Sequence, residues 1–327
     1  MVSYFECLCV LASFREPTTS HKGLFHEKTR RIAKNEIRHY FRLGDIVRLT
    51  MRRYHRAMFA KAIVRPPAPN FAEGLTTAGL GPPDYVRALK QHEAYCTALE
   101  QCGLTVTRLD ADPNYPDSCF VEDTAVIIPE FAFQCARVPT PTRVVLTRPG
   151  AASRTGEVKS MRAAFGQIAP EFAIQQIEPP GTLDGGDICE AGEHYFIGLS
   201  ERTNETGAEQ LAQLVTAHGY TAGLVDIRGS ESLLHLKSGL AYLDDNRLVV
   251  TEPLADRKEF ADFDLVIVPR GAEYAANCIK VNDYVLVAAG YEQFAETLRK
   301  RELKTLALDM SEFQKMDGGL SCLSLRW

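Results

Sequence analysis

The sequence predicts an α/β fold built from repeated ββαβ modules. Beyond residue 58, short β-rich runs alternate with helical segments. Several strand pairs, such as 188–189 with 195–197, follow one another directly before the next helix. The pattern returns about every 40–50 residues, a period typical of radial or solenoid architectures. Alternation alone would favour parallel βαβ units, but the paired strands favour ββαβ modules over a simple doubly wound sheet.

Eight β-rich segments are predicted as strands. In 104–109 apolar and polar residues alternate with a period of two, which is typical of a half-buried strand. In chain order the predicted strands are 60–65, 104–109, 143–147, 194–199, 247–251, 264–268, 283–289 and 304–309.

Four segments are predicted as helices. In the third, Leu211, Leu214 and Val215 fall at helical spacing, and Gly219 follows as a stop signal. The four predicted helices are 83–103, 156–168, 205–219 and 291–302.

The composition excludes several classes of protein. Hydrophobic residues at 45% and charged residues at 24% are ordinary for a globular domain. The chain has no apolar run of the length that a membrane helix needs, so we expect no membrane partner. The nine cysteines are odd in number and form no C-x-x-C pair, which argues against a disulfide scaffold or a structural zinc site and favours a reducing, cytoplasmic compartment. Both glycine-rich phosphate-binding signatures are missing, so a nucleotide cofactor has little support.

Residues 1–57 differ from the rest in charge. They hold 12 Lys and Arg against 5 Asp and Glu, although the whole chain has a net charge of −5. They have no clean apolar centre of a secretory signal. A nucleic-acid-binding arm and a transit peptide are alternatives, but the acids and weak periodicity count against both. We favour a third interpretation, in which translation begins at Met58. Residues 1–57 then lie outside the catalytic fold, 58–327 form a single domain, and nucleic acid is not a partner.

Four stretches are polar where strands should be apolar. Taken singly, His235 between two leucines is more often a core residue, and Cys322 is a small buried hydrophobe. Asp184 is most simply a turn former, and the Asp pair around its Gly-Gly has no further oxygen ligands to hold a cation. The stretches are 116–123, 182–189, 233–239 and 316–322.

Taken together, these residues fit nucleophilic catalysis. A cysteine attacks as thiolate, a histidine makes the thiolate available, and an acid holds the histidine in one orientation. Asp123 has no role in this set of three and would bind a cationic substrate. Carboxylates grip a guanidinium by paired hydrogen bonds, so thiolate attack on a guanidinium carbon suits this set.

Residues 59–327 closely resemble the dimethylarginine dimethylaminohydrolases, which belong to the pentein superfamily of guanidino-group-modifying proteins. The resemblance rests on seven stretches in order: "GLTTAGLGPPDY", "PDSCFVED", "RPGAASR", "LDGGDI", "IGLSERTN", "LHLKSG" and "MDGGLSC". It implies a five-bladed α/β propeller of ββαβ modules around a polar central site, with no metal or organic cofactor. The basic segment 1–57 has no counterpart in the family.

The resemblance also implies a role for each site residue. Cys322 is the nucleophile, His235 transfers protons, and Asp184 orients the histidine where some relatives carry Glu. Asp117 helps to bind the substrate amino group, and Glu122 and Asp123 bind the guanidinium. Two arginines bind the α-carboxylate. A covering loop and a further acid line the pocket. The substrate-binding residues so implied are Leu75, Asp117, Glu122, Asp123, Arg154, Arg202 and Asp317.

The implied reaction converts methylated arginine, a small-molecule substrate, to citrulline and an amine through a covalent S-alkylthiouronium on Cys322. A homodimer is compatible with the resemblance. An arginine deiminase is the nearest alternative, but that class normally carries an extra helical insertion. Agmatine deiminases use a substrate without a carboxylate, which the pair Arg154 and Arg202 argues against. Amidinotransferases are longer, and a non-catalytic relative would not need Cys322 with His235.

Overall fold

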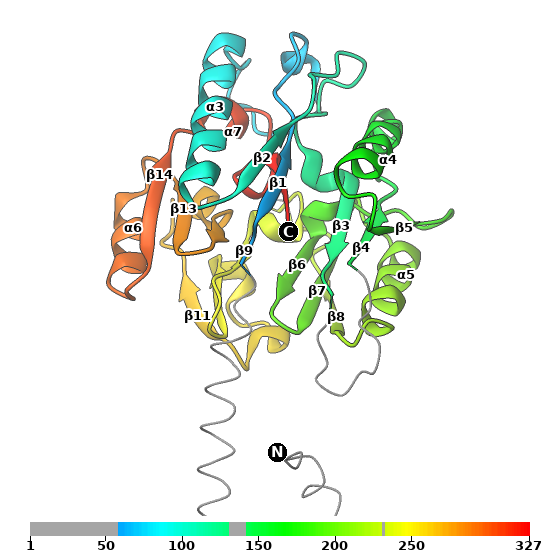
Figure 1. Ribbon diagram of the computed structural model, residues 1–327. Helices are drawn as coiled ribbons and strands as arrows, with labels where there is room; N and C mark the ends of the chain where they lie inside the picture. The colour runs from blue at the N-terminus through cyan, green and yellow to red at the C-terminus, as the bar shows by residue number, and fades with distance from the viewer. Residues whose placement is uncertain (1–57, 131–141, 231–232) are drawn as a thin grey trace, which may run out of the picture. The chain divides into compact units, whose positions relative to one another are not determined.

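The computed structural model describes residues 58–130, 142–230 and 233–327. These residues form five three-stranded sheets (Figure 1). None of their helices is both long and apolar enough to cross a bilayer. Segment 1–57 lies outside the described residues, so the boundary at Met58 stays a prediction.

All five sheets share one topology. The first strand of each sheet pairs antiparallel with the second, and the third pairs parallel with the second. The sheets are β15 (Leu325–Arg326), β1 (Lys61–Val64) and β2 (Thr105–Arg108); β3 (Ala125–Ile128), β4 (Arg143–Leu146) and β5 (Ala173–Gln176); β6 (Ile188–Ala191), β7 (His194–Leu199) and β8 (Thr221–Asp226); β9 (Leu240–Tyr242), β10 (Arg247–Val250) and β11 (Asp264–Ile267); and β12 (Ile279–Val281), β13 (Tyr284–Ala288) and β14 (Lys304–Leu308).

A helix connects the two parallel strands in four of the five sheets, which confirms the four predicted helices. They are α3 (Tyr85–Gln101), α4 (Glu157–Ile168), α5 (Glu205–Thr216) and α6 (Glu292–Arg299). The side chains of Asp84 and Asn204 cap α3 and α5, which stabilises their first turns.

The remaining sheet departs from the ββαβ pattern. Between β10 and β11 the chain forms two 3-10 turns, η7 (Glu252–Leu254) and η8 (Lys258–Phe260), in place of an α-helix. A further short helix, α7 (Ser311–Gln314), precedes the C-terminal segment.

The two ends of the described domain complete one sheet. In β1, Ala62 pairs with Arg326 of β15. The backbone N–H groups of Ala60 and Lys61 both donate to the carbonyl of Trp327, at 2.8 and 2.9 Å. The C-terminal strand is therefore held against the start of the domain.

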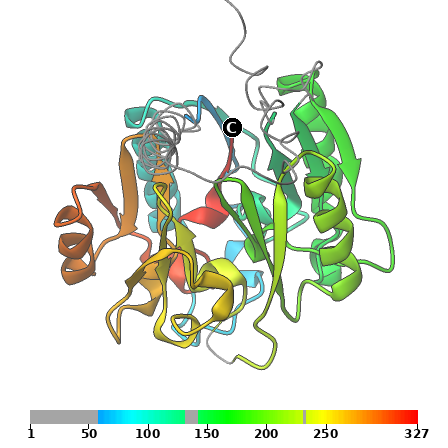
Figure 2. The same cartoon turned by 90° about the horizontal axis from the view of Figure 1, so that it is seen from below.

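Five apolar clusters join each sheet to its neighbours. One cluster packs the β1 sheet against the β12 sheet, and a second packs it against the β3 sheet. The other clusters join the β3 sheet to the β6 sheet, the β6 sheet to the β9 sheet, and the β9 sheet to the β12 sheet. Each sheet therefore contacts two others, which closes a ring of five and confirms the predicted five-bladed propeller. Figure 2 shows the C-terminal segment in its interior.

A 3-10 turn precedes the first strand of every sheet. The turns around the ring pack on one another from η3 to η5, η6 and η9, and η10 packs on η3. Hydrogen bonds between Asn277, next to η9, and Ser321 of η10 complete the circle. The five turns are η3 (Val121–Thr124), η5 (Gly185–Asp187), η6 (Leu236–Ser238), η9 (Glu273–Ala276) and η10 (Ser321–Leu323). They bring polar residues from distant parts of the sequence to one end of the ring.

Candidate active site

His235 and Asp184 form a fixed pair. His235 lies immediately before η6, and Asp184 lies immediately before η5. The His235 Nε2 atom is 3.0 Å from Asp184 Oδ2. The N–H of Gly150 donates to the other oxygen of Asp184 at 2.8 Å. Because both oxygens are bonded, the carboxylate can hold the imidazole in one orientation.

The surroundings of His235 favour its protonated form. Burial lowers the pKa of the imidazole, but the negative charges of Asp123, Asp187 and Asp184 outweigh burial and raise the pKa to about 9. At neutral pH the ring therefore carries a proton that it can donate.

Asp123 supplies a buried negative charge beside this pair. Its Oδ1 atom accepts the N–H of Gly186 at 2.8 Å, and its Oδ2 atom is 2.6 Å from Nη1 of Arg154. Burial opposes ionisation, but His235 and Arg154 hold the pKa of Asp123 below its ordinary value. The backbone of Gly186 must pass close by, since a Cβ there would lie 2.7 Å from the His235 ring.

Cys322 lies on η10 with its sulfur in an anionic environment. The N–H of Gly319 points at its Sγ atom at 3.4 Å. Burial and the carboxylates of Glu122 and Asp123 raise the pKa of the thiol to about 12. The thiol is therefore protonated at neutral pH unless a cation enters beside it.

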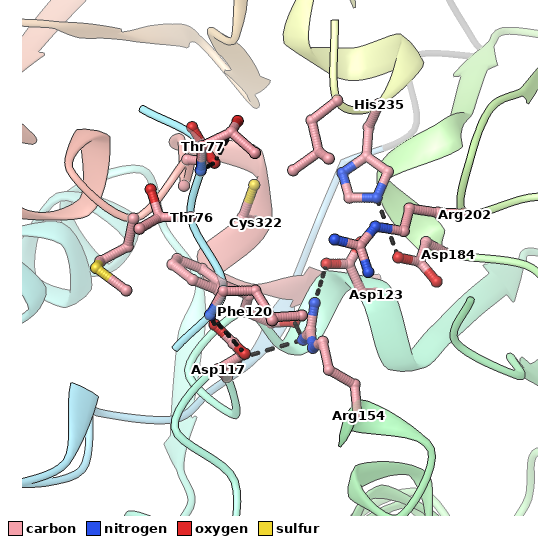
Figure 3. A pocket seen from close by; sticks show the side chains of 15 residues that line it. Thr76, Thr77, Asp117, Phe120, Asp123, Arg154, Asp184, Arg202, His235 and Cys322 are labelled. Carbon is pink, nitrogen blue, oxygen red and sulfur yellow. Dashed lines mark hydrogen bonds and ion pairs between the residues drawn. The ribbon is translucent and has the colours of Figure 1, made fainter. Parts of the chain in front are cut away.

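One cavity of about 140 Å³ joins these groups (Figure 3). The Cys322 thiol and the His235 ring face the same space, and Asp123 lies beside it. Nine of the ten predicted site residues line the cavity: Leu75, Asp117, Asp123, Arg154, Asp184, Arg202, His235, Asp317 and Cys322. The apolar part of the wall comes from Phe120, Leu234 and Met316.

The predicted covering loop is tied down on both sides of the cavity. It follows η2 (Phe71–Glu73), and the N–H of Leu75 donates to both oxygens of Asp117, at 3.1 and 3.2 Å. On the other side, Thr77 Oγ1 donates to Asp317 at 3.0 Å. Asp117 and Asp317 therefore hold the loop over the site.

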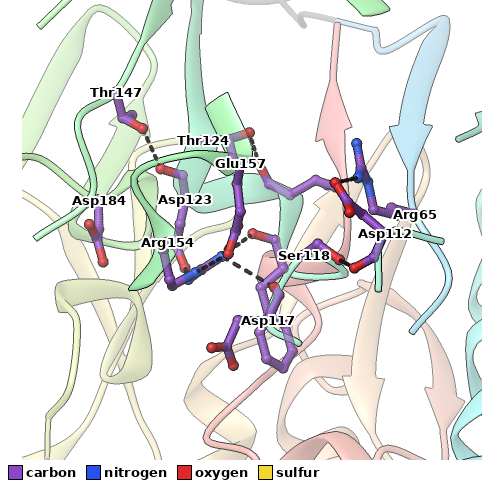
Figure 4. A network of polar contacts seen from close by, with 12 residues as sticks. Arg65, Asp112, Asp117, Ser118, Asp123, Thr124, Thr147, Arg154, Glu157 and Asp184 are labelled. Atoms are coloured by element: carbon purple, nitrogen blue, oxygen red, sulfur yellow. Dashed lines mark hydrogen bonds and ion pairs between the residues drawn. The ribbon is translucent and has the colours of Figure 1, made fainter. Parts of the chain in front are cut away.

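The two predicted carboxylate-binding arginines differ in how much of each guanidinium is already bonded. Arg154, the last residue of η4 (Ala152–Arg154), binds both oxygens of Glu157 at 3.0 and 2.9 Å and also binds Asp123 (Figure 4). Its Nη2 atom also donates to the carbonyl of Phe120 at 3.1 Å. The Arg202 side chain makes no hydrogen bond or ion pair with another described residue. Arg202 is thus the freer of the two for a ligand.

Glu122 is the one predicted site residue that does not line the cavity. Its Oε1 atom accepts from Lys237 Nζ at 2.6 Å, and its Oε2 atom accepts from Ser321 Oγ at 2.7 Å. The structure therefore places Glu122 behind the wall, where it holds the residue next to Cys322 rather than facing the cavity. A direct contact with the guanidinium is not supported by this geometry.

Sequence reasoning missed Asp187, the second acid of "LDGGD". This side chain has no exposed surface and accepts hydrogen bonds from Ser200, Thr203 and the N–H of Leu236. Its position directly after a glycine pair and three residues after Asp184 was a signal, but on its own it indicated only a turn or a cation site.

A metal ion could be held in the described part of the chain by Asp123, Asp184 and His235, whose ligand atoms lie within 4.8 Å of one another. The same atoms already have partners, because Asp123 binds Arg154 and Asp184 binds His235. The elevated pKa of His235 also favours a proton over a metal on the ring at neutral pH. These residues are therefore better suited to metal-independent chemistry.

Comparison with known sequences agrees with the site. Residues 140–282 match the sequence model of the arginine deiminase family. The chain is 40% identical over 270 residues to the N(G),N(G)-dimethylarginine dimethylaminohydrolase of Pseudomonas aeruginosa, covering 83% of this chain and all of the relative. It is 32% identical to the protein of the same name from Streptomyces coelicolor, covering 81% of this chain and 96% of the relative.

Solved structures give the same result. The P. aeruginosa enzyme, as a cysteine-to-serine mutant complexed with citrulline, superposes with a TM-score of 0.75 at 40% identity over 83% of this chain and all of that chain. The N-terminal domain of the arginine dihydrolase ArgZ from cyanobacteria shares the fold, with a TM-score of 0.70 at 19% identity over 82% of this chain and 97% of that domain. The five-bladed ring and its central site thus define a member of the pentein superfamily. Within it, the chain belongs to the dimethylarginine dimethylaminohydrolase family, as the sequence resemblance predicted.

Proposed function

We propose that this protein hydrolyses methylated arginine to citrulline and methylamine or dimethylamine, with Cys322 as the nucleophile. The observation that carries the proposal is the arrangement of the cavity, where a thiol, a protonated histidine and a buried anion face one space. The 40% identity over the full length of the P. aeruginosa enzyme supports the same reaction.

Charge complementarity supports an amino-acid substrate with a cationic side chain. The guanidinium would lie beside the buried carboxylates of Asp123 and Asp184, whose negative charge favours a cation. Arg202 would bind the α-carboxylate, since its guanidinium has no hydrogen bond or ion pair with the residues that the structure describes. Asp117 would bind the α-amino group and, through Leu75, also close the covering loop.

The substrate itself would activate the nucleophile. The carboxylates of Glu122 and Asp123 are causes of the raised thiol pKa, together with burial. A guanidinium cation that enters the cavity beside Asp123 and the sulfur offsets this negative charge, so the pKa of Cys322 falls. The thiol then gives its proton to water, and the thiolate forms next to the carbon that it attacks.

Two proton transfers by His235 complete the reaction. The thiolate of Cys322 adds to the guanidinium carbon, and His235 gives its proton to the departing amine, which leaves an S-alkylthiouronium. The neutral imidazole then takes a proton from water, and the hydroxide attacks the same carbon. Cleavage of the carbon–sulfur bond releases citrulline and restores the thiol.

Steady-state kinetics with four substrates test this function. We expect kcat/KM for dimethylarginine and monomethylarginine to exceed the values for arginine and agmatine. Faster turnover of arginine, with release of ammonia, would favour the alternative of an arginine deiminase. No release of amine or ammonia from any of the four would contradict the proposal.

The identity of the nucleophile has its own test. Cys322→Ser should stop turnover and keep the fold, because an alkoxide forms far less readily than a thiolate. Mass spectrometry of the unmodified protein, quenched during turnover, should find the substrate-derived adduct on the peptide that contains Cys322. An adduct on Cys119, Cys189 or Cys278 instead would contradict the mechanism.

A reducing, cytoplasmic location is part of the same proposal. All six described cysteines are free thiols, and five of them are buried. Such a set suits a compartment that keeps thiols reduced. The expected homodimer stays a prediction.

A further inference from the structure

The carboxylate of Asp187 lies behind the cavity wall at the point where three site segments meet. Its side chain has no exposed surface, and it does not line the cavity. Gly198 of β7 leaves the room for it, because a Cβ at that position would lie 3.0 Å from Asp187 Oδ1.

One oxygen of Asp187 holds the turn that carries Arg202. The Oδ2 atom accepts from Ser200 Oγ at 2.7 Å and from Thr203 Oγ1 at 2.6 Å. Ser200 Oγ in turn accepts the N–H groups of Arg202 and Thr203, at 3.0 and 3.1 Å. The backbone of Arg202 is therefore fixed through hydroxyl groups whose hydrogens both point at Asp187.

The other oxygen holds the segment that carries the histidine. Asp187 Oδ1 accepts the N–H of Leu236 at 2.9 Å, one residue after His235. A third link reaches the orienting acid, because Thr203 Oγ1 accepts the N–H of Asp184 at 3.1 Å. A single buried carboxylate thus connects the backbones of Arg202, His235 and Asp184.

The charge of Asp187 contributes as well as its geometry. Among the described residues it has no Lys or Arg partner, and its surroundings offer hydroxyl and backbone donors together with the charge of His235. The charged groups that face His235 are Asp123 from η3, Asp184 just before η5, and Asp187 from η5. An anion in this place therefore supports the proton on His235 without contact with a ligand.

We propose that Asp187 is the positioning residue that sets Arg202 and His235 relative to one another. Binding of the substrate carboxylate and transfer of the proton then both depend on this one side chain. This inference rests on the proposed function. It adds that carboxylate recognition and proton transfer fail together when this buried carboxylate is lost, although Asp187 touches no substrate.

The variant Asp187→Asn tests the proposal at constant size. An amide cannot accept from both Ser200 and Thr203 while also accepting from Leu236. Its NH₂ group would face either the N–H of Leu236 or two hydroxyls that already accept backbone N–H groups. We expect a folded protein whose kcat for dimethylarginine falls about 100-fold, as for a small misplacement of a reacting group. The segments 200–203 and 235–238 should exchange backbone hydrogens faster than in the unmodified protein.

A binding measurement separates this role from general damage. Calorimetry should show citrulline binding weakened about tenfold or more, as for a lost charged contact. The affinity for decarboxylated citrulline should change by less than about twofold, because this ligand has no carboxylate to contact Arg202. The proposal would be overturned if the affinities for both ligands fell equally, or if citrulline affinity and kcat did not change.

Two further variants keep the test decisive. Glu312→Gln removes another fully buried carboxylate, on α7, which accepts from the N–H of Asp84 and from Lys315. It should lower the melting temperature and leave kcat and both affinities unchanged; a loss of the same selectivity there would overturn the role assigned to Asp187. If Asp187→Asn does not fold, Ser200→Ala removes the hydroxyl link alone and should reproduce the selective loss of citrulline binding.

The binding and exchange measurements need no turnover. If the unmodified protein binds citrulline but releases no amine from dimethylarginine, the proposed function fails while the role of Asp187 is still measured. If the protein turns over dimethylarginine and Asp187→Asn behaves like the unmodified protein, the proposed function stands and this inference fails.

Discussion

Arg154 and Arg202 line the same cavity but have different partners. Arg154 is buried and binds Glu157 and Asp123, whereas Arg202 keeps its guanidinium free of described partners. We expect Arg154→Ala to lower the free energy of unfolding by about 3–5 kcal/mol, because two buried carboxylates lose their cation. Arg202→Ala should leave stability nearly unchanged and lower kcat/KM for dimethylarginine about 30-fold or more.

Chemical denaturation and kinetics with a carboxylate-free substrate check this division. Turnover of decarboxylated dimethylarginine should respond to Arg154→Ala and not to Arg202→Ala. If both variants fold normally and lose turnover only of the substrate that has a carboxylate, then Arg154 also binds the carboxylate, as the sequence resemblance implies.

The raised pKa of His235 predicts how stability depends on pH. The folded pKa of about 9 exceeds the ordinary value of 6.5, so the folded protein binds this proton more tightly than the unfolded chain does. The resulting stabilisation is fully present below pH 6.5 and is lost as the pH rises through 9. The difference in unfolding free energy between the unmodified protein and His235→Gln should shrink by about 1–3 kcal/mol between these limits. Urea unfolding at both ends of the range measures this change, and a pH-independent difference would contradict the raised pKa of His235.

At the residue scale, the sequence points to groups with distinctive chemistry, and the structure brings these groups to one cavity. Cys322, His235 and Asp184 stood out because a thiol, an imidazole and an acid have one obvious joint use. Asp187 and the position of Glu122 were not predictable, since each is defined by partners more than ten residues away, and in the case of Glu122 by partners on the turns η6 and η10. Whether an acid faces a cavity or lies behind its wall depends on the packing of the turns.

At the scale of elements, the 3-10 turns before the first strands require close backbone approach. Gly186 of η5 shows this most clearly, because a Cβ there would lie 2.7 Å from His235 Nδ1 and 2.9 Å from Asp123 Oδ1. Gly186→Ala should therefore move the histidine or the carboxylate and lower kcat/KM about 100-fold.

Gly166→Ala is the matched control for this substitution. Gly166 lies in α4, and nothing would meet a Cβ within 4 Å, so the change should raise stability by about 0.5–1 kcal/mol and leave kcat/KM unchanged. Melting temperatures and kinetics of the two variants compare the sites. Normal activity of Gly186→Ala would show that the turn η5 can move to accept a Cβ without disturbing the active site.

The strands that the sequence revealed are mainly the second and third strands of each sheet. All eight predicted strands are present, as β1, β2, β4, β7, β10, β11, β13 and β14. The strands missing from the prediction include β9, β12 and β15, which have only two or three residues each. So short a run has no measurable period, and its pairing is set by the neighbouring strand rather than by its own residues.

At the scale of the whole molecule, the ring closes through the two ends of the domain. The sheet that contains β1 takes its first strand from the C-terminus, and Cys322 lies on the turn η10 just before that strand. The repeat pattern predicted modules of one kind but could not predict which ends meet. That pairing joins residues more than 250 positions apart, and it depends on backbone hydrogen bonds and on apolar clusters between neighbouring sheets.

The same closure predicts where the chain can be shortened. β1 is bonded on both edges, to β15 and β2, and the backbone of Phe59 exchanges two hydrogen bonds of 2.9 Å with the Asn282 side chain. A chain of residues 58–327 keeps all of these contacts, so it should melt at the temperature of the full chain and retain its kcat/KM. A chain of residues 65–327 loses β1, which leaves β15 without its partner and Cys322 without support, and it should not fold. Circular dichroism and amine release on the two shortened chains measure the outcome. A large loss of soluble, active protein in residues 58–327 would place part of segment 1–57 in the catalytic fold.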